Sequence, residues 1–390
     1  MNLNAVITTE LFSLRETFVA RGFDLRLVGG AVRDLLRGVN PKDIDLCTDA
    51  SPEEQIEVYK DANVSYHETG LQHGTLTVVL AGVPYEITSL RTETDHDGRH
   101  AVVSYTKDWM DDLSRRDLTI NAMALTFDGV LIDPFGGADD LSKKIVRFVG
   151  SADDRMREDY LRILRWLRFH GRIDPTGPLD AETFAAAKRQ ASGMAKISRE
   201  RVWMEMSKIV VGNNVYELVS ALFDTGLAEH MDLTSDYAYD IFNMEDVVGE
   251  LGKTKNPVTA MVALLNNSER AVAEIATKWK WSANERDLGV WLAKTAFQFE
   301  AEGDYQFLIS HDEKPVEWVA ELARLMGDAE VAERLLIDSH PVFPVKGQDL
   351  LDMGMAPGKE IGQTLKLLRR EWADQDYSPS KDDLIAGLTG

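Results

Sequence analysis

The sequence predicts an α+β multidomain protein, with a mixed-sheet α/β head at the N-terminus and an entirely helical remainder. Short strand-like runs alternate with helical segments up to about residue 140. No convincing strand alternation follows Val149, whereas helical periodicity continues. The chain has 390 residues, which is too long for one simple core and implies two to four modules.

The head is expected to begin with an amphipathic helix over 9–20, followed by four strands at 25–28, 43–47, 74–80 and 83–90. Ala81-Gly82 separates the last two strands and predicts a hairpin. Residues 92–112 are polar and aperiodic, which predicts a mobile loop. A helix is expected over 114–124, and Asp128-Gly129 predicts a second hairpin between 125–127 and 130–132.

Helices are expected over five later segments, 155–170, 180–190, 198–211, 215–224 and 363–372, with a connector at 341–347. The eight histidines show no metal-binding spacing, and His311-Asp312 is isolated. The single cysteine, Cys47, excludes an internal disulfide framework and is expected to be a small core residue. No apolar run is long enough to span a bilayer, so a cytoplasmic protein is expected.

The net charge of −22 argues against a simple nucleic-acid-binding protein, which would usually be basic. The positive residues are unevenly distributed, however, and cluster between Lys143 and Arg201, while acidic residues dominate after Asn213. A local basic surface on an acidic protein would be sufficient for a modest phosphate-binding footprint.

A glycine pair, Gly29-Gly30, lies between the strand expected at 25–28 and a short helix for which Gly38 is the expected C-cap. Glycine lets the backbone approach a phosphate closely, and the N-terminus of a helix offers free N–H groups. Arg33, in the first turn, adds a guanidinium suited to phosphate. The segment predicts a phosphate-binding turn, although a glycine pair alone more often makes only a tight turn.

Two aspartates, Asp43 and Asp45, lie one residue apart on the next expected strand. Because side chains alternate along a strand, both carboxylates would share one face while Ile44 and Leu46 face the core. Carboxylate oxygens suit Mg²⁺, and two such ions about 3.5–4 Å apart would activate a hydroxyl and neutralise a leaving pyrophosphate. Asp43 and Asp45 are the candidate catalytic and metal-binding residues.

The order and spacing of the glycine pair, the helix and Asp43-Ile44-Asp45 resemble the signature of the nucleotidyltransferase superfamily. Gly29-Gly30-Ala31-Val32-Arg33-Asp34 is most similar to class II tRNA nucleotidyltransferases, the CCA-adding enzymes. The resemblance covers about 24–202 and, more faintly, 345–372. It implies a nucleotidyltransferase head, a base-recognising neck, a body and a tRNA-binding tail, with bounds 1–142, 143–211, 212–310 and 311–390.

The segment from Arg115 to Ala124 predicts, on its own, a surface helix with local ion pairs. It closely matches the Arg-Arg-Asp-Phe-Thr-Ile-Asn-Ala motif of the same family, with Leu118 in place of the aromatic residue. The resemblance implies that Arg116 directs its guanidinium at a nucleoside triphosphate.

Asp159 and Arg162 would be neighbours on one continuous helix, where they could form a local ion pair. They could also recognise a base, because cytosine and adenine both present an exocyclic amino donor beside a ring-nitrogen acceptor. Uracil and guanine present a carbonyl and a ring N–H at those places. The segment from Glu158 to Arg162 resembles the family's Glu-Asp-x-x-Arg motif, which implies a protein template for CTP and ATP.

Arg165 and Arg168 continue the spacing of three and complete the candidate nucleotide-binding set, which comprises Gly29, Gly30, Arg33, Arg116, Asp159, Arg162, Arg165 and Arg168. Three residues fall about 60° short of a helical turn, so Arg168 is expected roughly opposite Asp159. The segment from Ile197 to Val202 resembles a further motif of the family, but Ser198 followed by Arg201 predicts a helix start in which structural capping is the default role. Glu86 could be a third carboxylate facing the metals, although it is more simply a polar residue near the site. Arg91 could likewise belong to the site or be only a polar residue near it.

The resemblance implies addition of CTP and ATP to the 3′ end of tRNA, with Mg²⁺ as cofactor. A bacterial poly(A) polymerase, which shares this head, is an alternative. An enzyme that adds only A is another, because residues 92–112 are intact and CC-adding relatives often lack part of that loop. A catalytically inactive RNA-binding protein on the same scaffold is the alternative that is not an enzyme.

Overall fold

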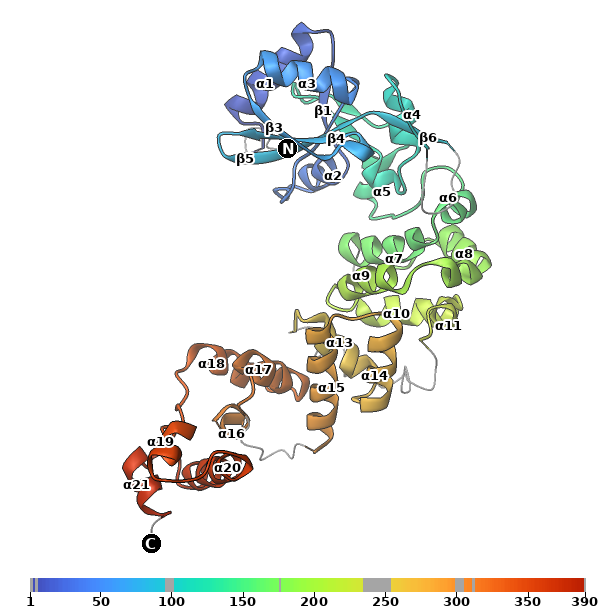
Figure 1. Cartoon of the computed structure of the whole chain (residues 1–390). Helices are drawn as coiled ribbons and strands as arrows, with labels where there is room; N and C mark the ends of the chain where they lie inside the picture. Colours follow the sequence, from blue (N-terminus) through green and yellow to red (C-terminus); the bar gives the residue numbers. More distant parts are fainter. Residues whose placement is uncertain are drawn as a thin grey trace. The chain divides into compact units, whose positions relative to one another are not determined.

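The computed structural model describes residue 3 and residues 6–94, 102–174, 177–233, 254–298, 305–310 and 313–388. These residues form two compact units, 1–232 and 233–390 (Figure 1). The first unit combines a mixed sheet with helices and the second is helical, so the expected α+β multidomain class is confirmed. The finer division into head, neck, body and tail stays a prediction.

The head contains a seven-stranded mixed sheet in the order β3-β4-β5-β2-β1-β8-β9. Its strands are β1 (Leu25–Val28), β2 (Asp45–Thr48), β3 (Ser65–Gly70), β4 (Thr75–Leu80), β5 (Val83–Ser89), β8 (Ala124–Leu125) and β9 (Leu131–Ile132). Only β2 and β5 pair in parallel; the other neighbours are antiparallel. Both expected hairpins, β4–β5 and β8–β9, are confirmed.

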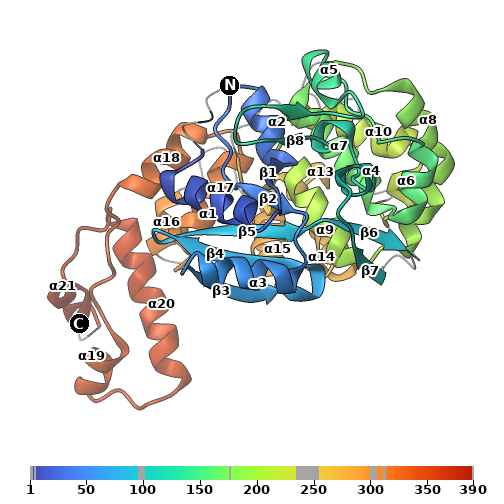
Figure 2. The ribbon, with the colours of Figure 1, turned by 90° about the horizontal axis from the view of Figure 1, so that it is seen from above.

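Three helices bury the apolar residues of this sheet: α1 (Thr9–Ala20), which has the expected bounds, α2 (Gly30–Leu36) and α3 (Pro52–Asp61). Phe18 of α1, Leu27 of β1 and Ile87 of β5 belong to one buried cluster, to which α2 and α3 also contribute. Figure 2 shows α3 alongside β3 and β4. The expectations did not include α3 or β3, although Ser51 and Glu54 form a capping box that starts α3.

The mobile loop expected over 92–112 is wrong for the described residues. Strands β6 (Arg91–Thr94) and β7 (Val102–Tyr105) form a separate two-stranded sheet, and α4 (Trp109–Ser114) follows. Thr92 pairs with Ser104 and Glu93 with Val103. Cross-strand pairing stabilises these strands, which are too short to give a visible period. Residues 95–101 of the expected loop lie outside the described residues.

The helix expected over 114–124 is also wrong, because the chain leaves α4 at Ser114 and continues through a short 3-10 helix, η3 (Thr119–Asn121). Polar side chains take the hydrogen bonds that a helix would need. The backbone N–H of Leu118 donates to Asp117 Oδ1 at 2.9 Å, and Thr119 Oγ1 donates to Asp140 Oδ2 at 2.6 Å.

Helices make up the rest of the first unit: α5 (Gly137–Ser142), α6 (Ala152–Glu158), α7 (Leu161–Ile173), α8 (Ala181–Gln190), η4 (Ala191–Lys196), α9 (Arg199–Ile209), α10 (Val215–Asp224) and α11 (Leu227–His230). The single helix expected over 155–170 is wrong, because it breaks at Asp159. That residue is extended, with φ −155° and ψ 107°. Its side-chain oxygen accepts a hydrogen bond from the Leu161 N–H at 3.1 Å and starts α7 afresh.

The second unit contains helices between α13 (Pro257–Leu264) and α21 (Lys381–Ala386): α14 (Glu269–Lys278), α15 (Ala283–Gln298), α16 (Tyr305–Ser310), α17 (Val316–Leu325), α18 (Ala329–Ile337), α19 (Gly347–Asp352) and α20 (Lys359–Asp374). Within the described ranges no strand follows β9, as expected. None of the described helices is long and apolar enough to cross a membrane. The isolated His311-Asp312 pair lies outside the described residues.

Candidate active site

A cavity of about 800 Å³ opens in the first unit between the end of the sheet and helices α7 and α9. Most of the candidate residues line it together: Gly29, Gly30, Arg33, Asp45, Arg116, Asp159, Arg162 and Arg165. Asp43 and Arg168 are not among the lining residues. The structure therefore brings the phosphate-binding turn, one aspartate and the expected base-reading pair around one space.

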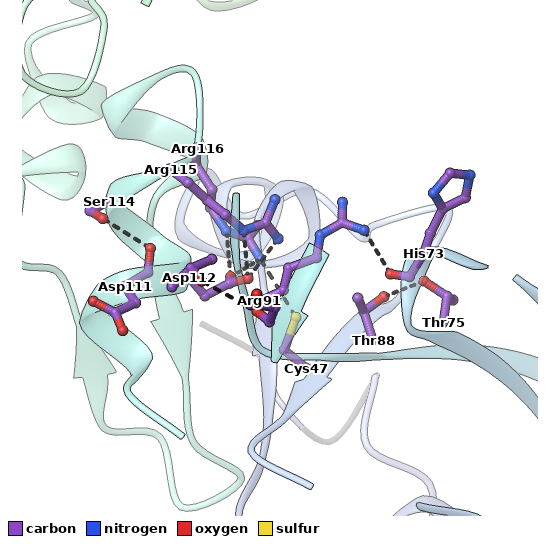
Figure 3. Close-up of polar contacts among 12 residues, drawn as sticks. Cys47, His73, Thr75, Thr88, Arg91, Asp111, Asp112, Ser114, Arg115 and Arg116 are labelled. Carbon is purple, nitrogen blue, oxygen red and sulfur yellow. Dashed lines mark hydrogen bonds and ion pairs between the residues drawn. The ribbon is translucent and has the colours of Figure 1, made fainter. Parts of the chain in front are cut away.

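Gly29 holds the turn between β1 and α2 with a φ of 62°, a conformation that glycine adopts far more readily than other residues. A Cβ at this position would lie 2.8 Å from Nη1 of Arg116. The Arg116 guanidinium in turn donates to Asp112 Oδ2 at 3.0 Å and contacts Cys47 Sγ at 3.6 Å (Figure 3). Cys47 is buried, as expected. Only glycine leaves room for Arg116 beside the turn.

Arg33 is almost fully buried, yet it lines the cavity. Its guanidinium donates from Nε to Asp34 Oδ1 at 3.0 Å and from Nη1 to Asn121 Oδ1 at 2.6 Å. Burial lowers the pKa of Arg33, but an arginine remains charged in proteins. These contacts hold a fixed cation behind the glycine turn.

Two further arginines, Arg91 and Arg115, line the same cavity, and Figure 3 shows them together with Arg116. Nη1 of Arg91 donates to the backbone oxygen of His73 at 2.6 Å, and Arg115 pairs with Asp112 at 2.6 Å. The expectations named Arg91 only as a doubtful neighbour of the site and did not assign Arg115, although it directly precedes Arg116. In total, seven arginines and five carboxylates line the cavity, an excess of positive charge that suits a polyphosphate.

Asp43 and Asp45 do not share one strand, so that expectation is wrong. Strand β2 begins at Asp45, and Asp43 lies in the exposed bend before it. The pairing ends there because the neighbouring strand β1 ends at Val28, where the chain turns at Gly29. Asp45 instead lies beside Glu86 in the parallel register of β2 and β5, and Glu86 also lines the cavity.

Three carboxylates are electrostatically linked at this edge of the sheet. Burial raises the pKa of Asp45, and the charges of Glu86 and Asp43 raise it further against the opposing effect of Arg116. Across the described part of the chain, no group of three or more His, Cys, Asp or Glu residues has the arrangement of a metal site. One or two carboxylates with substrate phosphates are the usual ligands of Mg²⁺, so Asp45 with Glu86 or Asp43 fits such an ion.

Asp159 and Arg162 line the cavity from two different elements, because the helix breaks between them. Asp159 Oδ2 accepts a hydrogen bond from Nη2 of Arg201 at 2.7 Å. Arg162 pairs through Nη1 with Glu158 and with the backbone oxygen of Arg155. The intrahelical pair of Asp159 and Arg162 is therefore replaced by two separate pairs.

Arg201, the partner of Asp159, is a residue that the sequence reasoning did not assign to the site. Its segment was expected by default to start a helix with a structural cap. Helix α9 does begin directly after Ser198, but that serine makes no side-chain capping hydrogen bond. The spacing gave no signal that Arg201 would reach Asp159, since 42 residues separate them. Arg201 also lines the cavity.

Arg165 connects α7 to the segment after α4 through Asp117 Oδ2, which accepts a hydrogen bond from Nε at 2.7 Å and forms an ion pair with Nη2 at 2.6 Å. Burial would raise the pKa of Asp117, but Arg165 outweighs it and holds that pKa below its ordinary value. Arg168 turns away and donates from Nε to Glu205 at 2.6 Å. This agrees with the expectation that arginines spaced three residues apart wind around the helix, so that Arg168 lies away from the side of Asp159.

Comparisons with known proteins extend over nearly the whole chain. Residues 25–147 match the poly A polymerase head domain family, and residues 178–235 match a family described as the probable RNA and SrmB-binding site of polymerase A. The human mitochondrial CCA tRNA nucleotidyltransferase 1 is 39% identical over 98% of this chain and 90% of its own length. The CCA-adding enzyme of Ligilactobacillus salivarius is 31% identical over 93% and 92%.

Among solved structures, the Bacillus stearothermophilus CCA-adding enzyme in complex with CTP superposes with a TM-score of 0.79 at 26% identity. The match covers 97% of this chain and 96% of that one.

Proposed function

This chain belongs to the family of CCA tRNA nucleotidyltransferases, and from that membership we propose that it adds CCA to the 3′ end of tRNA from CTP and ATP, releasing pyrophosphate. One observation carries the proposal: the cavity gathers a phosphate-binding turn, a carboxylate edge and a base-facing pair from segments far apart in sequence. The Bacillus stearothermophilus relative, solved with CTP, supports CTP as a substrate.

Gly29, Gly30, Arg33 and Arg116 hold the triphosphate in this proposal. The N-terminus of α2 offers backbone N–H groups, and the two guanidiniums are fixed by Asp34 and Asp112. Arg165, held by Asp117, adds a third cation. Such fixed donors stabilise charge that develops on the phosphates without having to reorganise during the reaction.

Asp43 and Asp45, with Glu86, are the proposed ligands of a divalent cation, and we assign Mg²⁺ because its ligands are carboxylate and phosphate oxygens. Such an ion, when bound, lowers the pKa of an attacking hydroxyl and offsets charge on a leaving group. The carboxylates themselves can accept a hydrogen bond from the 3′-hydroxyl of the RNA and so hold it toward the α-phosphate.

Asp159 and Arg162 read the base. A carboxylate has about four acceptor positions, and Arg201 and the Leu161 N–H occupy two of those on Asp159. The remaining capacity can accept from the exocyclic amino group of cytosine or adenine. Both bonds described for Arg162 leave from Nη1, and a guanidinium has five N–H groups, so it can donate to the ring nitrogen.

The test uses purified protein with Mg²⁺ and three tRNA transcripts, one lacking CCA, one ending in C and one ending in CC. Each receives CTP, ATP, UTP or GTP alone, and CTP with ATP. We expect ordered growth to CCA and rejection of UTP and GTP. The double variant Asp43→Ala/Asp45→Ala should lose transfer while it still binds tRNA, and full activity in that variant would end the assignment.

The same experiment separates the alternatives. Long A tails on unrelated RNA would indicate a poly(A) polymerase, and addition of A alone would indicate an A-adding enzyme. Saturable tRNA binding without incorporation at any Mg²⁺ concentration would indicate a binding protein. The human relative is named as mitochondrial, and the cytoplasmic location expected from this sequence stays a prediction.

A further inference from the structure

A second cavity, of about 380 Å³, lies where the C-terminal halves of α7 and α9 meet the turn before α10. We call it the basic groove; its charged lining residues are Arg168, Arg172 and Lys208, and Gly212 and Asn213 close one side. A Cβ on Gly171 would lie 2.7 Å from the backbone oxygen of Asn213. That glycine therefore lets α7 approach the turn closely.

Two cations of this groove, Arg172 and Lys208, face solvent while their carboxylate partners are buried, whereas the side chain of Arg168 is only 17% exposed. The Arg172 side chain is 45% exposed and its partner Asp34 is 9% exposed, at 2.8 Å. The Lys208 side chain is 51% exposed and its neighbour Glu205 is 3% exposed, at 3.7 Å. The exposed Arg37 adds another cation, since its Nη2 donates to the backbone oxygen of Arg172. The accessible surface of the groove is therefore positive on a protein whose net charge is −22.

The groove and the active-site cavity share one side chain. Glu205 lines the active-site cavity and also holds Arg168 at 2.6 Å and Lys208 at 3.7 Å in the groove. Along α7, Arg162 and Arg165 face the cavity, and Arg168 and Arg172 face the groove. At a rise of about 1.5 Å per residue, these four arginines span roughly 15 Å of helix. One helix thus extends a line of cations outward from the reaction centre.

We propose that the basic groove binds the sugar-phosphate backbone of the RNA strand directly upstream of the 3′ end that enters the cavity. The proposal rests on the proposed function and adds a second anchoring site, outside the nucleotide-binding residues. A line of separated guanidinium and ammonium groups suits successive phosphates better than one compact anion. Such contacts are independent of base sequence, so they would serve tRNAs that differ in sequence.

The experiment measures the dissociation constant of the full-length protein for a tRNA transcript lacking CCA between 50 and 200 mM KCl. The variant is Arg172→Gln/Lys208→Gln, in which the glutamine that replaces Arg172 retains a donor for Asp34. We expect the dissociation constant to rise on the order of tenfold, and the salt slope to fall by about 2, one for each lost phosphate contact. The affinity for CTP without RNA should not change.

The matched control is Arg21→Gln/Lys60→Gln, which also removes one arginine and one lysine from exposed ion pairs, with Asp61 and Glu57. It should leave the salt slope at the wild-type value. The single variant Lys208→Gln should lower the slope by about 1, and it serves if the double variant fails to fold.

An unchanged dissociation constant and salt slope in the groove variants would overturn the proposal. The proposal would also be overturned if the groove variants were inhibited less strongly by pyrophosphate but bound RNA as tightly as the wild type. That result would mean that the groove binds the pyrophosphate product. A loss of CTP affinity equal to the loss of RNA affinity would mean that the groove is not a separate site. Failure of nucleotide incorporation by the wild type would reject the proposed function alone, because the RNA-binding comparison does not depend on catalysis.

Discussion

Asp159 and Arg201, 42 residues apart, form a hydrogen-bonded ion pair with 2.7 Å between Oδ2 and Nη2. The other oxygen of the same carboxylate accepts the Leu161 N–H that starts α7. The carboxylate at the break between α6 and α7 is thus held from two directions, and α9 determines the position of an acceptor that faces the cavity. Arg201 consequently positions the carboxylate to which we assign base recognition in the proposed function.

Removal of this arginine should weaken base selection more than it weakens catalysis. In Arg201→Ala, Asp159 can rotate, and we expect the ratio of kcat/KM for CTP over UTP to fall about tenfold, equivalent to one lost buried polar contact. Arg201→Lys should restore part of the ratio. The measurement is single-nucleotide incorporation on a tRNA transcript lacking CCA.

The control is Arg199→Ala on the same helix, since Arg199 pairs with Asp232 at 2.8 Å and does not line the cavity. It should leave the CTP to UTP ratio at the wild-type value. Equal ratios in Arg201→Ala and the wild type would show that Asp159 does not need this partner.

Local patterns were sufficient to predict the parts of the fold that depend on local interactions. The helix α1, the strand β1, the turn at Gly29 and both hairpins of the head follow from periodicity and turn residues within a few positions. The cavity likewise contains most of the predicted binding residues. The helix, the strand, the turn and the hairpins are set by neighbours along the chain, which a single sequence reveals. The residues of the cavity come from distant segments, and several of them were expected from the family resemblance.

The predictions that were wrong concern features that depend on contacts between distant segments of the chain. The strands β6 and β7 are stabilised by pairing with each other across residues 95–101, and neither has enough length to show a period. The break at Asp159 depends on a side chain that caps α7 and is held by Arg201. Contacts between distant segments decide such features, and spacing within a motif cannot reveal them.

Gly29→Ala should impair both stability and nucleotide binding. Its φ of 62° is unfavourable for alanine, and the new Cβ would lie 2.8 Å from Arg116 Nη1. We expect a loss of roughly 1–2 kcal/mol in the free energy of unfolding, and a higher KM for CTP because Arg116 is displaced. The matched control is Gly38→Ala, whose φ is 74° with nothing within 4 Å of the new Cβ. Gly38→Ala should lower the free energy of unfolding without changing the KM for CTP. A raised KM in this variant would argue against displacement of Arg116.

Glu86→Gln tests the third carboxylate beside Asp45. If Glu86 contributes an oxygen ligand or orients one, the Mg²⁺ concentration for half-maximal incorporation should rise about tenfold. Glu57→Gln removes an exposed carboxylate of the same head that pairs with Lys60, and it should have no effect. The titration uses saturating CTP and tRNA, and an identical Mg²⁺ curve for Glu86→Gln and the wild type would limit the ligand set to Asp43 and Asp45.

Asp112 gives the stability of the head a defined pH dependence. Burial alone would raise the pKa of Asp112, but Arg116 and Arg115 outweigh it and hold the pKa below its ordinary value. A carboxyl group with a depressed folded-state pKa stabilises the protein fully above its unfolded pKa, near 3.9. This stabilisation is lost as the pH falls through the folded-state pKa.

Asp112→Asn leaves two arginines without their buried partner and should lower the free energy of unfolding by about 3 kcal/mol at pH 7. Denaturant unfolding of both proteins from pH 7 to pH 3 should show this difference constant down to about pH 4 and shrinking below it. A difference that stays the same at pH 3 would mean that the carboxylate charge contributes nothing, and that Asp112 acts only through its shape and its hydrogen bonds.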